Sequence, residues 1–182
     1  MQRQVSLFTP EVDWSPPSSL PDLSGYREVA IDLETYDPLL MSHGPSWAFT
    51  DAGYITGIAI ATKDFSMYFP IQHEGGGNLD KGLVLKWMAK QMSYENDKVF
   101  HNSLYDMGWL KRYNIKVNGT IHDTMFAAPL IDENQYSYSL NNLGEKYCGE
   151  TKDETLLSQA AEAYGLNPKS EMYRLPAKYV GP

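Results

Sequence analysis

Three apolar segments rich in β-branched and aromatic residues lie in the first half of the chain. They are REVAIDLE at 27–34, YITGIAIAT at 54–62 and SMYFPI at 66–71, and a short polar turn separates the last two. Runs of this length and composition predict β-strands. Because the three strands follow one another directly along the chain, the pattern favours an antiparallel meander.

The periodicity changes to that of helices from residue 81 onward. KGLVLKWMAKQMSYE places Leu83, Trp87 and Met88 at helical spacing. The elements that we expect after it are a strand at 97–102, a helix at 103–115, a short strand that runs into a helix from near Asp123 to 132, and helices at 138–149 and within 150–165. This order predicts an α/β domain with a mixed sheet, in which an antiparallel three-strand meander is followed by parallel strands, with helices on the flanks.

Length and composition favour one folded domain. A chain of 182 residues with 42% hydrophobic residues can bury one sizeable core. The stretch TPEVDWSPPSSLPDLSG is rich in proline and serine and has little periodicity, so residues 1–25 are expected to form an extended lead-in or linker. The domain itself is then expected to span 26–182.

The chain is acidic, with a formal net charge of −8 and a pI near 4.9. This balance argues against binding nucleic acid through a broadly basic surface, but it allows an enzyme whose acids collect metal ions that then meet phosphates. No apolar run of membrane-spanning length and no signal peptide is seen, so we expect no membrane partner and a cytoplasmic location. The only cysteine, Cys148, is expected to be a buried or half-buried thiol without a redox role.

Two acids interrupt the first apolar segment at Asp32 and Glu34. Residues two apart on a strand point to the same face, about 7 Å apart along the chain. Two neighbouring carboxylates on a buried face are costly, and a divalent metal ion would offset their repulsion. The alternative is a pair of acids at a solvated strand end, which is the commoner case for an isolated Asp-x-Glu.

A second candidate site lies in FHNSLYDMGWL, where Asn102 and Asp106 are four residues apart. This spacing places both on one side of a helix. Asp106 interrupts an otherwise apolar segment and is therefore a candidate metal ligand. The alternative is a helix-surface aspartate with Asn102 as an ordinary N-cap.

Other polar and aromatic residues carry weaker signals. Asp123 is interpreted as a helix N-cap rather than as a further catalytic acid. His73, His101 and His122 are scattered without the spacing of metal ligands. The indole rings of Trp87 and Trp109 are expected in the core.

The segments around both acidic patterns resemble a known family. AIDLET resembles the first motif, and HNSLYDMGWLKRYNI the second motif, of the 3′-5′ proofreading exonuclease domain of family A DNA polymerases, a branch of the DEDD exonuclease superfamily. VNGTIHDTMFAAPLIDEN and YSLNNLGEKYCG are similar to the segment that joins the second and third motifs. The resemblance covers residues 26–150 and implies a ribonuclease H-like fold, with two-metal hydrolysis of DNA that releases nucleoside 5′-monophosphates from a 3′ end.

The resemblance also implies roles for individual residues. Asp32 would bridge two Mg²⁺ or Mn²⁺ ions, Glu34 would help hold the ion that activates water, and Asp106 would serve the second ion. Leu33 and Thr35 would lie against the terminal nucleotide, and Asn102 would orient the site or touch the strand. The implied partners are the 3′ end of single-stranded DNA and a polymerase domain in the same or another chain.

The family's third motif, which supplies a fourth carboxylate, has no match. Neither Tyr-x-x-x-Asp nor His-x-x-x-x-Asp occurs after residue 110, and the pair His101 and Asp106 overlaps the second motif. RLPAKYVGP resembles the lead-in to the third-motif helix. We therefore expect a domain that lacks this helix, hydrolyses DNA weakly or not at all by itself, and self-associates through the uncovered sheet face.

Two other functions compete with a proofreading exonuclease. One is a non-catalytic nucleic-acid-binding or interaction module that keeps the fold. A module without chemistry has no reason to keep Asp32, Glu34 and Asp106 together, which favours the enzyme. The other is an RNA-directed nuclease of the same superfamily, which the polymerase-like segment HDTMFAAPLI disfavours.

Overall fold

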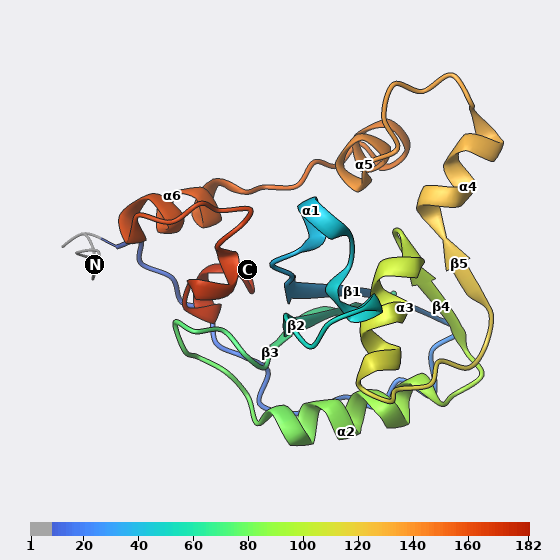
Figure 1. Ribbon diagram of the computed structural model, residues 1–182. Coiled ribbons are helices and arrows are strands. Elements are labelled where there is room, and N and C mark those ends of the chain that lie inside the picture. The colour runs from blue at the N-terminus through green and yellow to red at the C-terminus, as the bar shows by residue number, and fades with distance from the viewer. Residues whose placement is uncertain (1–8) are drawn as a thin grey trace.

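A five-stranded mixed sheet forms the centre of the computed structural model, which describes residues 9–182 (Figure 1). The strands are β1 (Glu28–Tyr36), β2 (Tyr54–Ala61), β3 (Ser66–Pro70), β4 (Asp97–Phe100) and β5 (Ile121–Asp123). Their spatial order is β3-β2-β1-β4-β5, with antiparallel pairing of β1 to β2 and of β2 to β3. Because β4 and β5 then add in parallel, the predicted α/β class and the meander followed by parallel strands are confirmed.

Helices follow the strands at the predicted places. They are α1 (Leu40–His43), α2 (Lys81–Met92), α3 (Ser103–Arg112), α4 (Thr124–Ile131), α5 (Leu140–Cys148) and α6 (Thr155–Tyr164), with 3₁₀ turns η1 (Ser46–Ala48), η2 (Met172–Arg174) and η3 (Ala177–Tyr179). The sequence did not predict α1 or the three 3₁₀ turns. Within residues 9–182, every helix is too short or too polar to cross a membrane.

The main core lies between one face of the sheet and helices α2 and α3. Alternation along β1 sends Val29, Ile31 and Leu33 into this core. Trp87 of α2 and Trp109 of α3 pack there, as predicted. The apolar face of α2 is formed mainly by residues other than Leu83, whose side chain is 62% exposed.

The described part of the lead-in packs against α2. Leu23 is fully buried, and its backbone N–H donates to Gln91 Oε1 at 2.8 Å. Trp87 Nε1 donates to the Pro21 carbonyl at 2.7 Å. Residues 1–8 of the expected lead-in lie outside the described residues.

The C-terminal segment packs on α6 and on the loop after β3. Its apolar cluster contains Leu175 and Tyr179, although the sequence showed no clear pattern there. The backbone N–H of Glu74 donates to the Tyr173 carbonyl at 2.9 Å, and Ala177 N–H donates to the Gly76 carbonyl at 3.0 Å. These bonds bring the end of the described chain to the sheet face opposite α2 and α3.

Candidate active site

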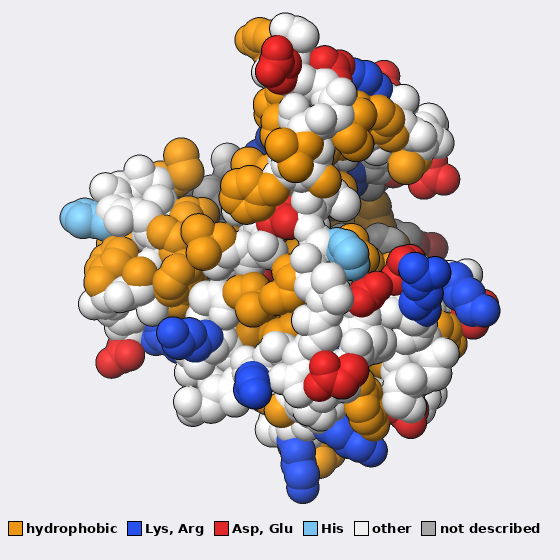
Figure 2. All heavy atoms as spheres, turned by 90° about the vertical axis from the view of Figure 1, so that its right-hand side faces the viewer, with side chains coloured by type: hydrophobic (Ala, Val, Ile, Leu, Met, Phe, Trp, Pro, Cys, Tyr) orange, Lys and Arg blue, Asp and Glu red, His pale blue; other side chains and the backbone are white. Residues whose placement is uncertain are grey.

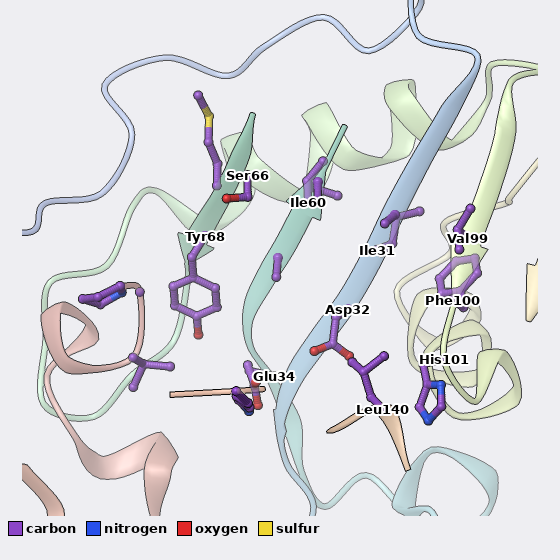
Figure 3. Close-up of a pocket in the computed structure, with 18 of the residues that line it drawn as sticks. Ile31, Asp32, Glu34, Ile60, Ser66, Tyr68, Val99, Phe100, His101 and Leu140 are labelled. Atoms are coloured by element: carbon purple, nitrogen blue, oxygen red, sulfur yellow. The ribbon is translucent and has the colours of Figure 1, made fainter. Parts of the chain in front are cut away.

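A cavity of about 640 Å³ lies on the sheet face that α2 and α3 do not cover (Figure 3). Strands β1, β2, β3 and β4 supply its floor, and the segment around Trp14 and the C-terminal residues supply part of its wall. The polar side chains that line it include Asp32, Glu34, Tyr68, His101 and Lys152. We refer to this side of the sheet as the site face.

The acids of β1 project into this cavity because their neighbours project into the core. Ile31 and Leu33 are buried, whereas Asp32 is exposed to the cavity and Glu34 is half-buried. Opposite the two acids, β2 carries only Ala59 and Gly57. Ala59 lines the cavity beside Asp32, whereas the Tyr68 side chain occupies the space over Gly57.

Asp106 reaches the same region from the first turn of α3. Its side chain is only 3% exposed, and Oδ1 accepts a hydrogen bond from the Leu33 backbone N–H at 3.3 Å. Because Leu33 lies between Asp32 and Glu34, this bond ties α3 to the centre of the acidic pair. The structure thus brings together the three acids that the sequence singled out.

The start of α3 is capped by Asp123 from β5. Asp123 accepts hydrogen bonds from the N–H groups of Asn102 at 3.2 Å and Ser103 at 2.6 Å. It also caps α4 through the N–H groups of Met125 and Phe126, so its predicted N-cap role is confirmed. Asn102 occupies the N-cap position of α3, but it is not an ordinary N-cap, because its side chain makes no cap hydrogen bond.

Asn102 instead has a left-handed backbone with φ of 69° and an exposed side chain. Such a conformation is uncommon outside glycine, and asparagine tolerates it better than most residues. It turns the chain sharply between β4 and α3. The side chain is therefore free of the helix and lies at the edge of the site.

A hydrogen-bond network fixes α3 against the end of β1. Thr35 Oγ1 and Tyr105 Oη are 2.7 Å apart, and Tyr105 Oη donates to Asp37 Oδ2 at 3.1 Å. Asp37 also accepts from the Ser46 N–H at 3.2 Å. Because Tyr105 precedes Asp106, the network holds the Asp106 backbone in register with β1.

Burial raises the pKa of all three carboxyl groups, and repulsion from Asp32 adds to the shift at Glu34 and Asp106. Burial, followed by the charge of Asp32, raises the pKa of Glu34 to about 7. Burial, again followed by Asp32, raises the pKa of Asp106 to about 8, although the Leu33 N–H acts against the shift. Asp32 keeps contact with solvent, yet the surrounding protein raises its pKa too. A cation among these groups would relieve both costs.

Two basic side chains that the sequence analysis did not select also line the cavity. Lys152 and His101 act to lower the pKa of Asp32. His101 Nδ1 is held 2.9 Å from Thr124 Oγ1. Lys152 comes from the connection between α5 and α6, and no local sequence pattern marks it.

The oxygen donors suit a hard divalent cation such as Mg²⁺ or Mn²⁺. As they stand, no three His, Cys, Asp or Glu side chains within residues 9–182 are grouped closely enough to hold a metal ion. Repulsion between carboxylates favours such separation, and a bound cation would favour their approach. The donor set fits a divalent ion in its chemistry.

The remaining candidate residues occupy different positions. Leu33 is buried in the core with 5% of its surface exposed, so its N–H is the part that reaches the site. Thr35 is half-buried and bound to Tyr105. Cys148 is exposed, so the expected burial of its thiol is wrong.

The sequence is similar to 3′-5′ exonucleases and to DNA polymerases. The profile of a 3′-5′ exonuclease family matches residues 20–173. A DNA-directed DNA polymerase of Pseudomonas phage M6 is 42% identical over 98% of this chain and 28% of its own length. DNA polymerase I of Chloroflexus aurantiacus is 28% identical over 72% of this chain and 15% of its own length.

Solved structures show the same fold. Brucella melitensis NrnC with bound Mg²⁺ has a TM-score of 0.52 and 19% sequence identity, over 79% of this chain and 64% of that one. At this identity the likeness concerns the fold alone. The chain spans less than a third of the length of the phage polymerase that it matches.

Proposed function

Because this chain belongs to the 3′-5′ exonuclease family of A-type DNA polymerases, we propose that it removes nucleotides from the 3′ end of DNA by hydrolysis. The observation that carries the proposal is that Asp32 and Glu34 line one cavity, while Asp106 bonds the Leu33 N–H between them and feels the charge of both acids. The substrate would be a single-stranded 3′ end, and each product a nucleoside 5′-monophosphate. In a polymerase, such a reaction serves as proofreading.

The proposed cofactor is a pair of Mg²⁺ or Mn²⁺ ions. Exonucleases of this superfamily generally depend on divalent metal, and the carboxylates of Asp32, Glu34 and Asp106 are the groups that would hold it here. When bound, such ions stabilise the attacking and leaving oxygens of an in-line displacement at phosphorus. The chain's own contribution is to keep the acids partly desolvated and to tie Asp106 to β1 through the Leu33 N–H.

The terminal nucleotide would lie along the end of β1. We assign its contacts to the Leu33 backbone, the Thr35 side chain and Asn102. The exposed amide of Asn102, which does not cap α3, supports a contact with the DNA strand. The acidic chain would then meet phosphates through metal ions more than through basic side chains.

The non-catalytic module remains the competing function. The separation of the acids in this structure is the observation that favours it. Against it, a module without chemistry would keep three neighbouring carboxyl groups at a cost in stability and without use. The enzyme is therefore the better-supported function.

We propose that the surface formed by α4 and α5 binds a polymerase domain. Figure 2 shows hydrophobic side chains gathered on this part of the molecule, and Phe126, Leu130 and Ile131 of α4 are exposed by 58%, 88% and 73%. Exposed apolar surface of this kind marks contact sites.

On its own the chain is expected to self-associate through this apolar surface and through the site face. Sedimentation velocity tests this, since a strictly monomeric profile at high concentration would exclude it.

The direct test is release of labelled mononucleotide from 3′-labelled and 5′-labelled single-stranded DNA. The 182-residue chain is assayed with Mg²⁺, Mn²⁺ or EDTA, beside Asp32→Asn and the exposed control Asp64→Asn. We expect slow, metal-dependent release from the 3′ end, lost in Asp32→Asn and kept in Asp64→Asn. Absence of release with either metal, or release that survives Asp32→Asn, favours the non-catalytic module, and a preference for RNA favours the RNA-directed nuclease.

A further inference from the structure

The Tyr68 hydroxyl lies beside Glu34, although the two residues are on strands separated by β2. Gly57 of β2 pairs directly with Glu34, and a Cβ built on Gly57 would meet Tyr68 Oη at 2.0 Å. The hydroxyl therefore fills the space where a side chain at position 57 would begin. Since paired residues of antiparallel strands have Cβ atoms about 5 Å apart, that space adjoins the Glu34 side chain.

Tyr68 reaches this position by extending across the sheet. Its direct partner on β2 is Ala59, and its ring passes over the glycine at position 57. Figure 3 shows the hydroxyl directed toward the end of the sheet where Glu34 lies. Only a residue without a side chain at position 57 allows this arrangement.

His73 holds the Tyr68 hydroxyl from the other side. Tyr68 Oη and His73 Nε2 are 2.6 Å apart, and the two side chains are 6% and 3% exposed. Asn78 fixes the His73 backbone, because its Oδ1 accepts from the His73 N–H at 2.7 Å and its Nδ2 donates to the His73 carbonyl at 2.8 Å. The loop after β3 is thus built to present this imidazole to Tyr68.

The His73 imidazole meets the Tyr68 hydroxyl as a neutral ring. Burial lowers the pKa of His73 to about 4, although the Leu175 and Met172 backbone groups act in the opposite sense. A neutral imidazole can hold the hydroxyl through Nε2 without bringing a further charge to this side of the sheet.

We propose that Tyr68 is a positioning residue for Glu34 and that His73 keeps Tyr68 in place. The hydroxyl bounds the space on the β2 side of the Glu34 carboxylate and so confines that group toward Asp32. A neutral oxygen performs this task without adding a third charge beside the two acids. The inference rests on the proposed function, because it assumes that Glu34 helps to hold a divalent ion.

The test measures the affinity of the 182-residue chain for Mn²⁺. Electron paramagnetic resonance reports the concentration of free Mn²⁺, and a thermal melt of every variant reports its stability. Tyr68→Phe removes only the hydroxyl, and Tyr164→Phe removes a hydroxyl from the separate α6 cluster as the matched control. We expect Tyr68→Phe to raise the dissociation constant about three- to tenfold, the size of one lost hydrogen bond. Tyr164→Phe should leave the affinity unchanged.

Two further variants separate positioning from general stability. His73→Leu should weaken Mn²⁺ binding like Tyr68→Phe, and the double variant should bind no worse than Tyr68→Phe alone, because both changes remove one interaction. Gly57→Ala displaces the Tyr68 ring and should weaken binding more than tenfold. If Gly57→Ala does not fold, the other two variants still decide.

The outcomes distinguish this inference from the proposed function. If Asp32→Asn abolishes Mn²⁺ binding while Tyr68→Phe binds as the unaltered chain does, the positioning role is overturned and the proposed function stands. A lower melting temperature of Tyr68→Phe with unchanged affinity also overturns it, since this indicates a purely structural hydroxyl. If the unaltered chain does not bind Mn²⁺, or Asp32→Asn binds equally well, both proposals fail.

Discussion

The two faces of β1 meet opposite conditions within one strand. On the core face, Ile31 and Leu33 are buried under α2 and α3. On the site face, Asp32 and Glu34 line a cavity together with Ala59 and Tyr68. Period-two alternation therefore supplies a stable foundation and a reactive surface from the same nine residues.

The core on one face of β1 supports the site on the other face. Burial disfavours the charged form of Asp32, and the apolar burial of its neighbours Ile31 and Leu33 offsets this cost in the free energy of folding. Substitutions on the site face should change chemistry more than stability, and substitutions on the core face should do the reverse. The predictions below test this separation.

The largest expected effect is on the chemistry of the site face. Asp32→Asn should reduce nucleotide release about a thousandfold or more, because it removes a proposed metal ligand. The free energy of unfolding should stay the same or increase, since one of three repelling charges is lost. Single-turnover nuclease assays and urea titrations measure the two quantities, and a marked loss of stability would contradict the separation.

The matching change on the core face is Ile31→Ala. It should reduce the free energy of unfolding by about 3 kcal/mol, as is typical for truncation of a buried side chain. Activity per folded molecule should remain within about twofold at a temperature where the variant is folded. Leu40→Ala on the more exposed α1 serves as the control with little effect in urea titration.

The free energy of unfolding should depend on pH through the carboxyl groups of the site. Burial raises the pKa of Glu34 to about 7 and that of Asp106 to about 8 in the folded chain, above their ordinary values of 4.5 and 3.8. Between about pH 4.5 and 8 the folded chain therefore binds more protons than the unfolded chain, and the free energy of unfolding falls as pH rises. Thermal melts without metal should show this fall, and Glu34→Gln with Asp106→Asn should flatten it.

Divalent metal should stabilise the folded chain through the site face. At ten times its dissociation constant, Mn²⁺ should add about 1.4 kcal/mol to the free energy of unfolding. Asp106→Asn should reduce this gain, whereas Ile31→Ala should keep it. Melting curves with increasing Mn²⁺ check the effect, and an equal gain in Asp106→Asn would show that the metal binds elsewhere.

The smallest effect is expected where the two faces join. Tyr105→Phe removes the hydrogen bonds to Thr35 and Asp37 and should cost about 1 kcal/mol in the free energy of unfolding. Because the network aligns α3 with β1, activity should fall only severalfold. Urea titration and steady-state kinetics measure both, and an unchanged stability would show that the network is not needed.

The sequence carried most of the fold because strands and helices are encoded locally. Three successive apolar runs of strand-like composition predicted the meander, and the placement of Asp32 and Glu34 on one face followed from the strand period. The faces of helices were less certain: Leu83 fits the apolar spacing of α2 but is exposed, because the position of the sheet decides which side is covered. The α1 helix is too short to leave a pattern.

The site was predictable only where its residues lie in motifs. Asp32, Glu34 and Asp106 stand in segments with family resemblance. Tyr68 and His73 were missed because their nearness to Glu34 depends on strand order and on the absence of a side chain at position 57. No local spacing records such a tertiary contact.

The proposed function requires that Asp32, Glu34 and Asp106 hold the metal used for hydrolysis. Anomalous diffraction at the Mn absorption edge, from crystals of the chain grown with saturating Mn²⁺, locates the metal. We expect an anomalous peak bounded by the carboxylates of Asp32, Glu34 and Asp106, and its loss in Asp32→Asn crystals. A peak elsewhere alone, or none at this cavity, would contradict it.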